Sequence, residues 1–321
     1  MREVLTAGRY FKKRFGGKVY KIPISISGFT CPNIDGTVAR GGCVFCENES
    51  FSPNLEHQTD TIQPKRFFLN PTSHNPYLDF QLLQLEAQFK KTKERLKKKF
   101  GAKKFIVYFQ SFTNTYAPLD TLKALYEKAL GFEDVIGLSI GTRTDSINEE
   151  VLAYIAELSK HHEIWIEYGV QSSSDKTLER INRGHDSANV AKFIRLTRQY
   201  GLKICAHVIF GLPDETPEMM LESVKFALSL DVQSFKFHPL YVVKRTALAN
   251  DFKKGDFTPI SEELYIQTLV KAIKLLPQDV MIQRVSAGIE DDTLLSPSWC
   301  YTKHQQMLKI REALKKEGLL Y

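Results

Sequence analysis

The sequence lacks any apolar run near the roughly 20 residues that a membrane-spanning helix needs. It begins Met-Arg-Glu-Val-Leu, without the apolar core of a secretory signal. No short internal repeat and no low-complexity linker interrupts its 321 residues. The 43% of hydrophobic and 25% of charged residues are typical of a globular protein. We therefore expect a cytoplasmic protein without a membrane partner, built as one large α/β unit with or without a small appendage.

Cysteine is scarce, yet three of the five cysteines lie in one loop, CPNIDGTVARGGCVFC. Cys31, Cys43 and Cys46 fall within sixteen residues, and three glycines give the loop backbone freedom. Cytoplasmic thiols stay reduced, so clustered cysteines there bind metal more often than they form disulfides. Three soft thiolates can hold one iron–sulfur cluster and leave one iron open to a small molecule.

A zinc site is the alternative interpretation of this loop. His57, which follows Cys46 by eleven positions, could complete a Cys₃His site. A structural zinc knot usually organises a very small domain, whereas this loop lies within a long series of strands and helices. An iron–sulfur site also explains why only three cysteines cluster, and we favour it.

Positive charge exceeds negative charge, and the excess is concentrated. The net charge is +7, and segment 90–104 carries nine basic residues and one acid. Segment 9–15, Arg-Tyr-Phe-Lys-Lys-Arg-Phe, alternates cations with aromatic residues. Such stretches fit phosphate contacts combined with base stacking, and so favour a nucleic-acid partner. The alternative is a solvated helix face and a disordered leader.

Short apolar runs alternate with helix-length segments along the chain. The predicted strands are 19–27, 104–111, 135–143, 163–171, 203–211 and 234–241. The predicted helices between them are 78–100, 119–130, 148–161, 187–200 and 217–230. This alternation predicts right-handed βαβ units, a parallel sheet and a partial (β/α)6 barrel. A helix over 261–276, a strand-like run over 280–286 and a helix over 303–317 form a small C-terminal α/β extension.

We divide the chain into a basic leader (1–18), a barrel (19–262) and a C-terminal extension (263–321) that packs on the barrel. In such barrels the chemistry gathers at the carboxyl ends of the strands. The cysteine loop follows the first strand, so it should lie at that rim.

The rim motifs resemble those of radical S-adenosylmethionine enzymes. The matching stretches, in order, are the cysteine loop, YFQSFTNTYAP, GTRTDSI, EYGVQSSSDKTLERINRGH, HVIFGLPDET and PSW. The resemblance covers about residues 20–262 and is strongest to the YhcC-type family. It is more distant to the Elongator catalytic subunit and to oxygen-independent coproporphyrinogen oxidase. The gap of eleven residues between Cys31 and Cys43, where the common signature has three, characterises this branch.

The resemblance implies a 4Fe–4S cluster held by Cys31, Cys43 and Cys46, with S-adenosylmethionine on the open iron. It implies cofactor contacts from Phe45, Thr113, Asn114, Arg143, Glu167, Gln171, Arg183, Ile209 and Gly211. Arg183, or Arg180 nearby, would pair with the methionyl carboxylate, for which a planar guanidinium is suited. Glu167 and Gln171 would contact the ribose or methionine part, or instead cap their strand or pair with a basic neighbour. Asp145 is equally a rim residue or a helix cap.

Strand alternation, independent of the family, singles out three polar side chains. Lys236 and His238 share one face of the strand 234–241, as His207 and Ile209 do on 203–211. Lysine rarely points into an apolar helix layer, so Lys236 and His238 should face the barrel interior, with His207 beside them. We expect these three residues to bind an anionic part of the substrate or to move protons, the alternative being histidines satisfied within the core.

The implied chemistry is reductive cleavage of S-adenosylmethionine to a 5′-deoxyadenosyl radical, which abstracts hydrogen from an unactivated carbon. Because no second cluster is visible, a flavodoxin- or ferredoxin-type reductant is implied. Cys205 lies inside a strand as a small apolar residue, and Cys300 is either structural or a substrate-facing thiol. Arg284 and the turn 297–299 either close over the barrel mouth or pack the last helix.

The family resemblance further suggests a substrate, the wobble uridine of tRNA, whose 5-carboxymethylaminomethyl side chain would become 5-aminomethyl. One alternative is radical chemistry on a small carboxylated metabolite or a porphyrin. The other is a zinc-containing RNA-binding protein without enzymatic activity.

Overall fold

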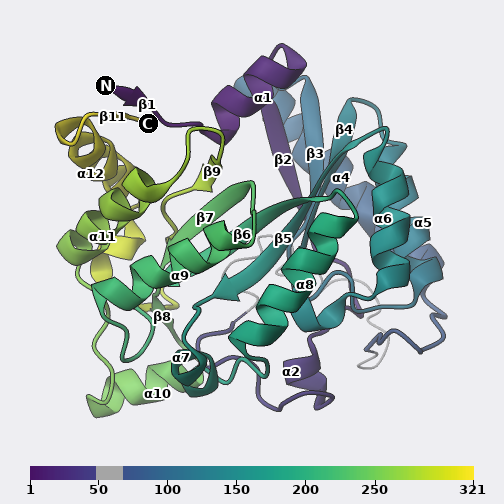
Figure 1. Cartoon of the computed structure of the whole chain (residues 1–321). Coiled ribbons are helices and arrows are strands. Elements are labelled where there is room, and N and C mark those ends of the chain that lie inside the picture. The colour runs from purple at the N-terminus through teal and green to yellow at the C-terminus, as the bar shows by residue number, and fades with distance from the viewer. Residues whose placement is uncertain (48–67) are drawn as a thin grey trace.

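The computed structural model describes residues 1–47 and 68–321, and its centre is a curled sheet of seven parallel strands (Figure 1). The strand order is β2-β3-β4-β5-β6-β7-β9. These strands are β2 (Val19–Ile24), β3 (Lys104–Phe109), β4 (Val135–Thr142), β5 (Glu163–Gln171), β6 (Lys203–Phe210), β7 (Ser234–Pro239) and β9 (Met281–Arg284). The main helices are α4 (Leu78–Phe100), α5 (Leu119–Leu130), α6 (Glu149–Ser159), α8 (Ser187–Gln199), α9 (Pro217–Ser229), α11 (Glu262–Leu275) and α12 (Lys303–Lys316).

The predicted partial barrel is confirmed, and its sheet gains one strand from the C-terminal extension. Six strands are those expected from the alternation of apolar runs and helices. The seventh, β9, is the strand-like run 280–286, which pairs in parallel with β7. The extension therefore continues the sheet and also supplies residues to the barrel interior.

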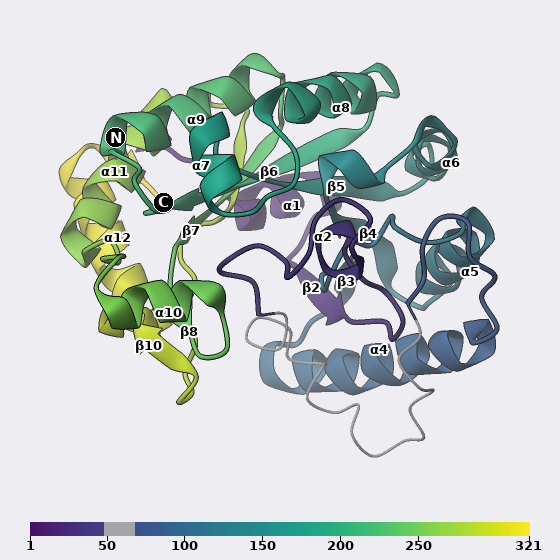
Figure 2. The same ribbon diagram turned by 90° about the horizontal axis from the view of Figure 1, so that it is seen from below.

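Helices cover the outer face of the sheet in an arc, which Figure 2 shows from the carboxyl ends of the strands. Apolar side chains such as Ile22, Phe109 and Leu125 fill the space between the two layers and are at most 1% exposed. Burying each such side chain contributes roughly 1.5–3 kcal/mol. Two helix starts are capped by side chains, because Asn148 accepts from the Val151 amide and Asp186 from the Asn189 amide. These caps fix where α6 and α8 begin.

The basic leader is a helix, α1 (Ala7–Phe15), that closes the amino end of the barrel. Tyr10 packs edge-on against Trp165, and its hydroxyl donates to Glu163 at 2.7 Å. Arg14 donates to the same carboxylate at 2.8 Å, and Phe11 is 3% exposed. The interpretation of the leader as disordered is therefore wrong. Phe11 is buried and Tyr10 is half-buried with one side against Trp165, so the leader does not offer both rings to stack on bases.

Short elements near the ends of the chain complete the fold. Strand β1 (Arg2–Glu3) pairs in parallel with β11 (Leu319–Leu320), so the two termini lie side by side in Figure 1. Strand β8 (Val242–Val243) pairs with β10 (Leu294–Ser296), next to helix α10 (Ala247–Lys254). No helix in the described part of the chain is both long and apolar enough to cross a bilayer.

Candidate functional site

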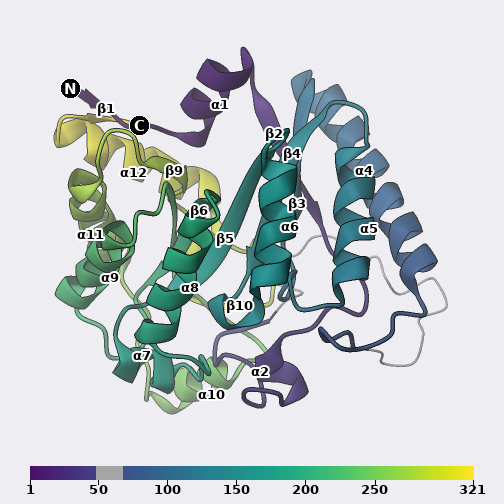
Figure 3. The same cartoon turned by 45° about the vertical axis from the view of Figure 1, so that its right-hand side comes forward.

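The cysteine loop lies at the carboxyl end of β2, at the opposite end of the sheet from α1 (Figure 3). Cys31 precedes a single helical turn, α2 (Pro32–Asp35), and the Cys46 amide donates to the Cys43 carbonyl at 2.9 Å. All three cysteines line one cavity of about 160 Å³. The predicted position of the three thiols at the rim is therefore confirmed.

The loop is held from below by the segment that follows α7 (Asp175–Arg180). Asn182 donates to the Gly42 carbonyl at 2.8 Å, and Asn33 donates to the Asn182 carbonyl at 2.6 Å. Gly184 has a φ of +79°, and a Cβ there would lie 2.4 Å from Oδ1 of Asn33. Glycine is thus required at this contact, because any side chain would push the loop away. The INRG stretch 181–184 serves as the base on which the cysteine loop rests.

Two buried arginines surround Cys43. Nη1 of Arg183 lies 3.6 Å from Sγ of Cys43, and its Nη2 donates to the Gly169 carbonyl at 2.6 Å. Arg143 makes a two-pronged ion pair with Asp145 and also donates to the Arg183 carbonyl at 2.8 Å. Arg180 instead pairs with Asp251 on α10 at 2.9 Å. Of the two arginines considered for the cofactor, the structure places Arg183 at the cavity, and Asp145 orients Arg143.

Several polar atoms around the thiols lack hydrogen-bond partners in the described structure. These atoms show whether the site suits the implied cluster and S-adenosylmethionine. Nη1 of Arg143, Nε of Arg183 and Oε1 of Gln171 are buried and have no hydrogen-bond partner in the described structure. Buried donors normally find partners, so these atoms are arranged for a group that binds there. Two cationic guanidiniums suit an anionic cluster and a carboxylate. The residues fit such a cluster, which Cys31, Cys43 and Cys46 would hold.

The remaining residues predicted to contact the cofactor differ in which cavity they line. Phe45, Thr113, Glu167 and Gln171 line the thiol cavity. Ile209 lines an adjoining cavity, whereas Asn114 and Gly211 line neither.

Asn114 and Gly211 have structural tasks. The side-chain amide of Asn114 donates to the Gly141 carbonyl at 2.9 Å and so joins two strand ends. Gly211 has a φ of +88°, and a Cβ there would lie 2.7 Å from Ile260. Packing occupies these two side-chain positions, and the predicted cofactor contacts of Asn114 and Gly211 stay predictions.

Glu167 is the centre of a buried polar network in the middle of the barrel. Its carboxylate accepts from Lys21 and Ser139, each at 2.5 Å, and from His207 at 2.8 Å. Lys236 also donates to it, and its ammonium lies 4.2 Å from the centre of the Tyr108 ring. With both oxygens engaged by the protein, Glu167 acts on this site by positioning its neighbours. Its predicted contact with the cofactor stays a prediction.

The charges within this network determine the protonation states of Glu167 and His207. Burial alone would raise the pKa of Glu167, but Lys21, Lys236 and His207 together hold it well below its ordinary value. Burial, followed by Lys236, lowers the pKa of His207 to about 4. His207 is therefore neutral at pH 7, and its Nε2 carries the proton because an ionised carboxylate can only accept.

The parity prediction for the barrel interior is confirmed. His207 pairs with Lys236 across β6 and β7, and the rings of His207 and His238 lie 5.7 Å apart. Lys236, however, is held behind Tyr108 and Glu167 with 3% of its side chain exposed. Glu167, Cys205 and His207 could also place three ligand atoms around a metal ion. Two ammonium groups on the same carboxylate oppose a cation there, and we assign no metal to that cluster.

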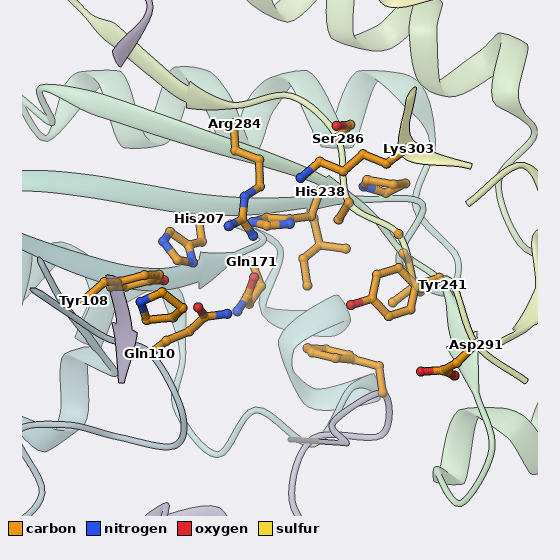
Figure 4. Close-up of a pocket in the computed structure, with 17 residues that line it drawn as sticks. Tyr108, Gln110, Gln171, His207, His238, Tyr241, Arg284, Ser286, Asp291 and Lys303 are labelled. Carbon is orange, nitrogen blue, oxygen red and sulfur yellow. The ribbon is translucent and has the colours of Figure 1, made fainter. Parts of the chain in front are cut away.

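A larger cavity of about 670 Å³ adjoins the thiol cavity. Figure 4 shows His207, His238, Arg284 and Lys303 around it, with Gln110, Gln171 and Tyr241 on other sides. Sequence analysis did not identify Tyr108, Gln110, Lys303 or the Glu167 partner Lys21. Lys21 carried a usable signal, since it is a lysine within an apolar strand, as Lys236 is.

One largely buried carboxyl at the rim, that of Glu215, has no cation beside it among residues 1–47 and 68–321. Ser172 donates to Oε1 of Glu215, while Oε2 has no hydrogen-bond partner in the described structure. Burial raises the pKa of Glu215 from 4.5 to about 7. The folded state therefore binds a proton that the unfolded state releases between these values. Stability should fall as pH rises through that interval.

We expect Glu215→Gln to be more stable than the wild type by up to about 3 kcal/mol at pH 8, and similar to it near pH 4. Urea unfolding at both pH values measures this difference. If the difference in unfolding free energy between Glu215→Gln and the wild type were the same at both pH values, the prediction would be contradicted. Ser172→Ala, which removes the donor and leaves the carboxyl, is the matched control and should keep the pH dependence.

The two basic stretches lie together, but away from the site. Lys104 donates to the Phe15 carbonyl at 2.6 Å, and the rings of Tyr20 and Phe100 stack with centres 5.6 Å apart. This patch surrounds the amino ends of β2 and β3, whereas the cysteines follow the carboxyl ends (Figure 3). A six-residue strand separates the two ends by about 20 Å. The basic patch is too far away to touch a nucleotide that enters the cavity. Contact between this patch and RNA stays a prediction, and it would involve a part of the RNA distant from that nucleotide.

Comparisons with known proteins agree with this site. The Radical SAM superfamily model matches residues 35–227, and the Radical_SAM C-terminal domain model matches residues 232–316. YhcC of Escherichia coli K12 is 34% identical over 308 residues, which cover 96% of this chain and 91% of YhcC. The tRNA uridine(34) acetyltransferase of Methanocaldococcus infernus is 28% identical over 157 residues, covering 48% of this chain and 29% of that protein.

A solved structure supports the fold. Elp3 of Methanocaldococcus infernus matches with a TM-score of 0.57 at 18% identity, covering 94% of this chain and 63% of Elp3. The matched family uses a 4Fe–4S cluster and S-adenosylmethionine. The zinc interpretation is therefore wrong, and its fourth ligand, His57, lies outside the described residues. With its three cysteines at the rim of a curled parallel sheet, the chain belongs to the radical S-adenosylmethionine superfamily.

Proposed function

We propose that this radical S-adenosylmethionine enzyme acts on the wobble uridine of tRNA and converts its 5-carboxymethylaminomethyl side chain to 5-aminomethyl. The carboxymethyl unit would leave as glyoxylate when water hydrolyses the oxidised C–N bond, and the cleavage of S-adenosylmethionine would take up the two electrons that this oxidation releases. The observation that carries the proposal is the pair of adjoining cavities, one lined by thiols and the other by cations. The two share the lining residues Phe45, Tyr108, Gln110, Gln171 and His207. A substrate in the larger cavity would therefore lie beside the cofactor.

The size and chemistry of the larger cavity suit a modified nucleoside. Ligand pockets for molecules of this size measure about 300–1,000 Å³, and this cavity measures about 670 Å³. Tyr108, Tyr241 and Phe45 offer aromatic surface for a base, and Arg284 offers charge for a carboxylate. One similar protein supports an RNA substrate, because it is named a tRNA uridine(34) acetyltransferase.

The described side chains would divide the work. When bound, the cluster and S-adenosylmethionine supply the one-electron chemistry that abstracts a hydrogen atom. Arg183 and Arg143 would hold anionic parts of these cofactors through their unpaired nitrogens. His207 and His238 face the substrate as neutral imidazoles, since burial is the first cause that lowers the pKa of each. Lys236 would act through Glu167, by keeping that carboxylate ionised and His207 in one tautomer.

An external reductant belongs to the proposal. Outside the loop, the described residues contain only Cys205 and Cys300, both fully buried on separate elements. These cannot hold a second cluster, so we propose that a flavodoxin- or ferredoxin-type protein delivers the electron.

The nucleoside content of tRNA tests this function. A strain that lacks the protein should accumulate 5-carboxymethylaminomethyluridine and lose all detectable 5-aminomethyluridine derived from it. Digestion of bulk tRNA and mass spectrometry measure both nucleosides. Re-expression of the wild type should restore the profile, and a Cys43→Ala variant should not. An unchanged profile in the deletion strain would contradict the proposed substrate.

A small carboxylated metabolite is the second candidate, favoured by the distance between the basic patch and the cavity. Retention of tRNA separates the two. A tRNA enzyme should bind tRNA at physiological salt and lose affinity steeply as salt rises. A metabolite enzyme would show no such binding.

A further inference from the structure

Arg284 is a cation without a counter-ion at the edge of the larger cavity. It is the last residue of β9, and its guanidinium points into the cavity toward His238 (Figure 4). No carboxylate, carbonyl or hydroxyl among residues 1–47 and 68–321 accepts a hydrogen bond from it. A partly buried arginine with five donors normally has acceptors, so its partner should come from outside the part of the chain that the structure describes.

The surrounding charges do not neutralise Arg284. Among the residues that line the cavity, Asp291 is the single acid, and it is exposed. Its Oδ1 accepts from the Thr293 amide at 2.8 Å and from the Thr293 hydroxyl, which commits it to a local turn. Lys303 adds a second positive charge at the rim. This wall of the cavity therefore carries a net positive charge.

Deeper in the barrel, Lys236 is already matched by Glu167. Its ammonium is buried between that carboxylate and Tyr108, with 3% of the side chain exposed. It is therefore a poor candidate for binding a substrate anion directly. The available anion-binding group is Arg284, and it lies on the wall formed by β7 and β9, across from the cysteine loop.

We propose that Arg284, with Lys303 at the rim and His238 beside it, binds the carboxylate of the substrate and makes the enzyme select carboxylated over uncharged substrates. The proposal rests on the proposed function, which identifies that carboxylate as the end of the wobble-uridine side chain. A guanidinium can hold a carboxylate with two parallel hydrogen bonds. The C-terminal extension thus supplies substrate selectivity to a site whose cofactor is held by the barrel.

Two substrates that differ only in charge test the selectivity. Anticodon stem-loops would carry either the 5-carboxymethylaminomethyl group or its uncharged methyl ester, and kcat/KM would be measured for each with reconstituted enzyme. We expect the wild type to prefer the acid by about 30- to 1,000-fold, as for a desolvated charge pair. In Arg284→Gln, kcat/KM should fall by that factor for the acid and stay unchanged for the ester, so that the acid-to-ester ratio comes near one. In Arg284→Lys the ratio should lie between those of the wild type and Arg284→Gln.

Controls separate this effect from a general defect. Cleavage of S-adenosylmethionine without substrate should be equal in wild type and Arg284→Gln, because Arg284 does not line the thiol cavity. Lys244→Gln removes an exposed cation that pairs with Asp292 and should leave the acid-to-ester ratio unchanged. An equal loss on acid and ester in Arg284→Gln would mean that Arg284 binds an RNA phosphate, and would overturn the proposal.

A second measurement does not depend on tRNA. Crystals of the holoenzyme soaked in bromide should show anomalous density between Arg284 and Lys303, and Arg284→Gln crystals should lack it. Bromide bound there, with stem-loops left unmodified by an enzyme that still cleaves S-adenosylmethionine, would support the anion site and overturn only the wobble-uridine substrate. The absence of bromide from wild-type crystals together with an unchanged acid-to-ester ratio in the variant would overturn the inference itself.

Discussion

Replacing Glu167 with glutamine is expected to lower the free energy of unfolding by about 3–5 kcal/mol, because it leaves buried charges without their counter-ion. The Glu167 side chain is 0% exposed, and the ammonium groups of Lys21 and Lys236 both bind it. A glutamine amide would offer its oxygen to only some of the donors and set its own NH₂ against the rest. Urea unfolding at pH 7.5 measures the loss. His207 would also lose its acceptor, so turnover should fall with it.

Removing one of the two cations should partly reverse this loss. Glu167→Gln combined with Lys236→Met eliminates the most deeply buried ammonium, so the double variant should be more stable than Glu167→Gln alone. Non-additivity of this kind is expected for residues that share one ion-pair network. Additive losses, or a Glu167→Gln variant as stable as the wild type, would contradict the proposed charge balance.

The chain contains a matched control at the amino end of the barrel. Glu163 is also 0% exposed and accepts from Arg14 at 2.8 Å and Lys203 at 2.6 Å. Those cations are 53% and 30% exposed, so water can solvate them when the carboxylate is lost. Glu163→Gln should therefore cost less, about 1–3 kcal/mol, and should leave turnover unchanged.

The pH dependence of this contribution has a definite sign. The pKa of Glu167 in the folded state lies well below its ordinary value of 4.5. Its stabilisation is thus complete above 4.5 and is lost as pH falls below that value. On acidification the wild type should lose stability relative to Glu167→Gln, whereas it should gain stability relative to Glu215→Gln.

Strands and long helices could be predicted because their signals are local. Segment 119–130 is the same helix in sequence and structure, since its apolar spacing and flanking residues define it. Strands of two or three residues could not be predicted in this way. β1 is paired with β11 at the other end of the chain, and such pairings leave no local pattern. The leader did carry a signal, because Thr6 and Gly16 cap α1.

The site residues also differ in whether a local sequence pattern could place them. Alternation along a strand placed Lys236 and His238 in the barrel interior, and the structure agrees. The same rule fails for Arg284, because the side-chain oxygen of Gln283 already accepts a hydrogen bond from Lys21 inside the barrel, and adjacent residues should face opposite ways. A register shift between β7 and β9 sets Arg284 opposite Lys236 and turns it inward. That shift depends on pairing in three dimensions.

Each of the three loop cysteines is expected to be indispensable. After anaerobic reconstitution, Cys31→Ala, Cys43→Ala and Cys46→Ala should contain almost no iron. Their cleavage of S-adenosylmethionine should fall by at least about 1,000-fold, since a cluster with two thiolates is not held. Iron content and 5′-deoxyadenosine formation measure these outcomes. The folded state should survive, because the loop rests on the 181–184 segment through Asn33 and Asn182.

Cys205 and Cys300 supply the matched controls, since both thiols are fully buried away from the loop. Cys205 lies among Trp165 and Met281, so Cys205→Ala should cost about 1–2 kcal/mol of stability by leaving a small void, yet keep its iron. Cys300→Ala should behave in the same way. His57→Ala should also keep the iron, because the proposed cluster ligands are the three loop cysteines. A loop variant that retains both iron and cleavage, or a Cys205→Ala variant that loses iron, would contradict the assignment of the ligands. The two sets of variants therefore distinguish loss of a ligand from loss of packing.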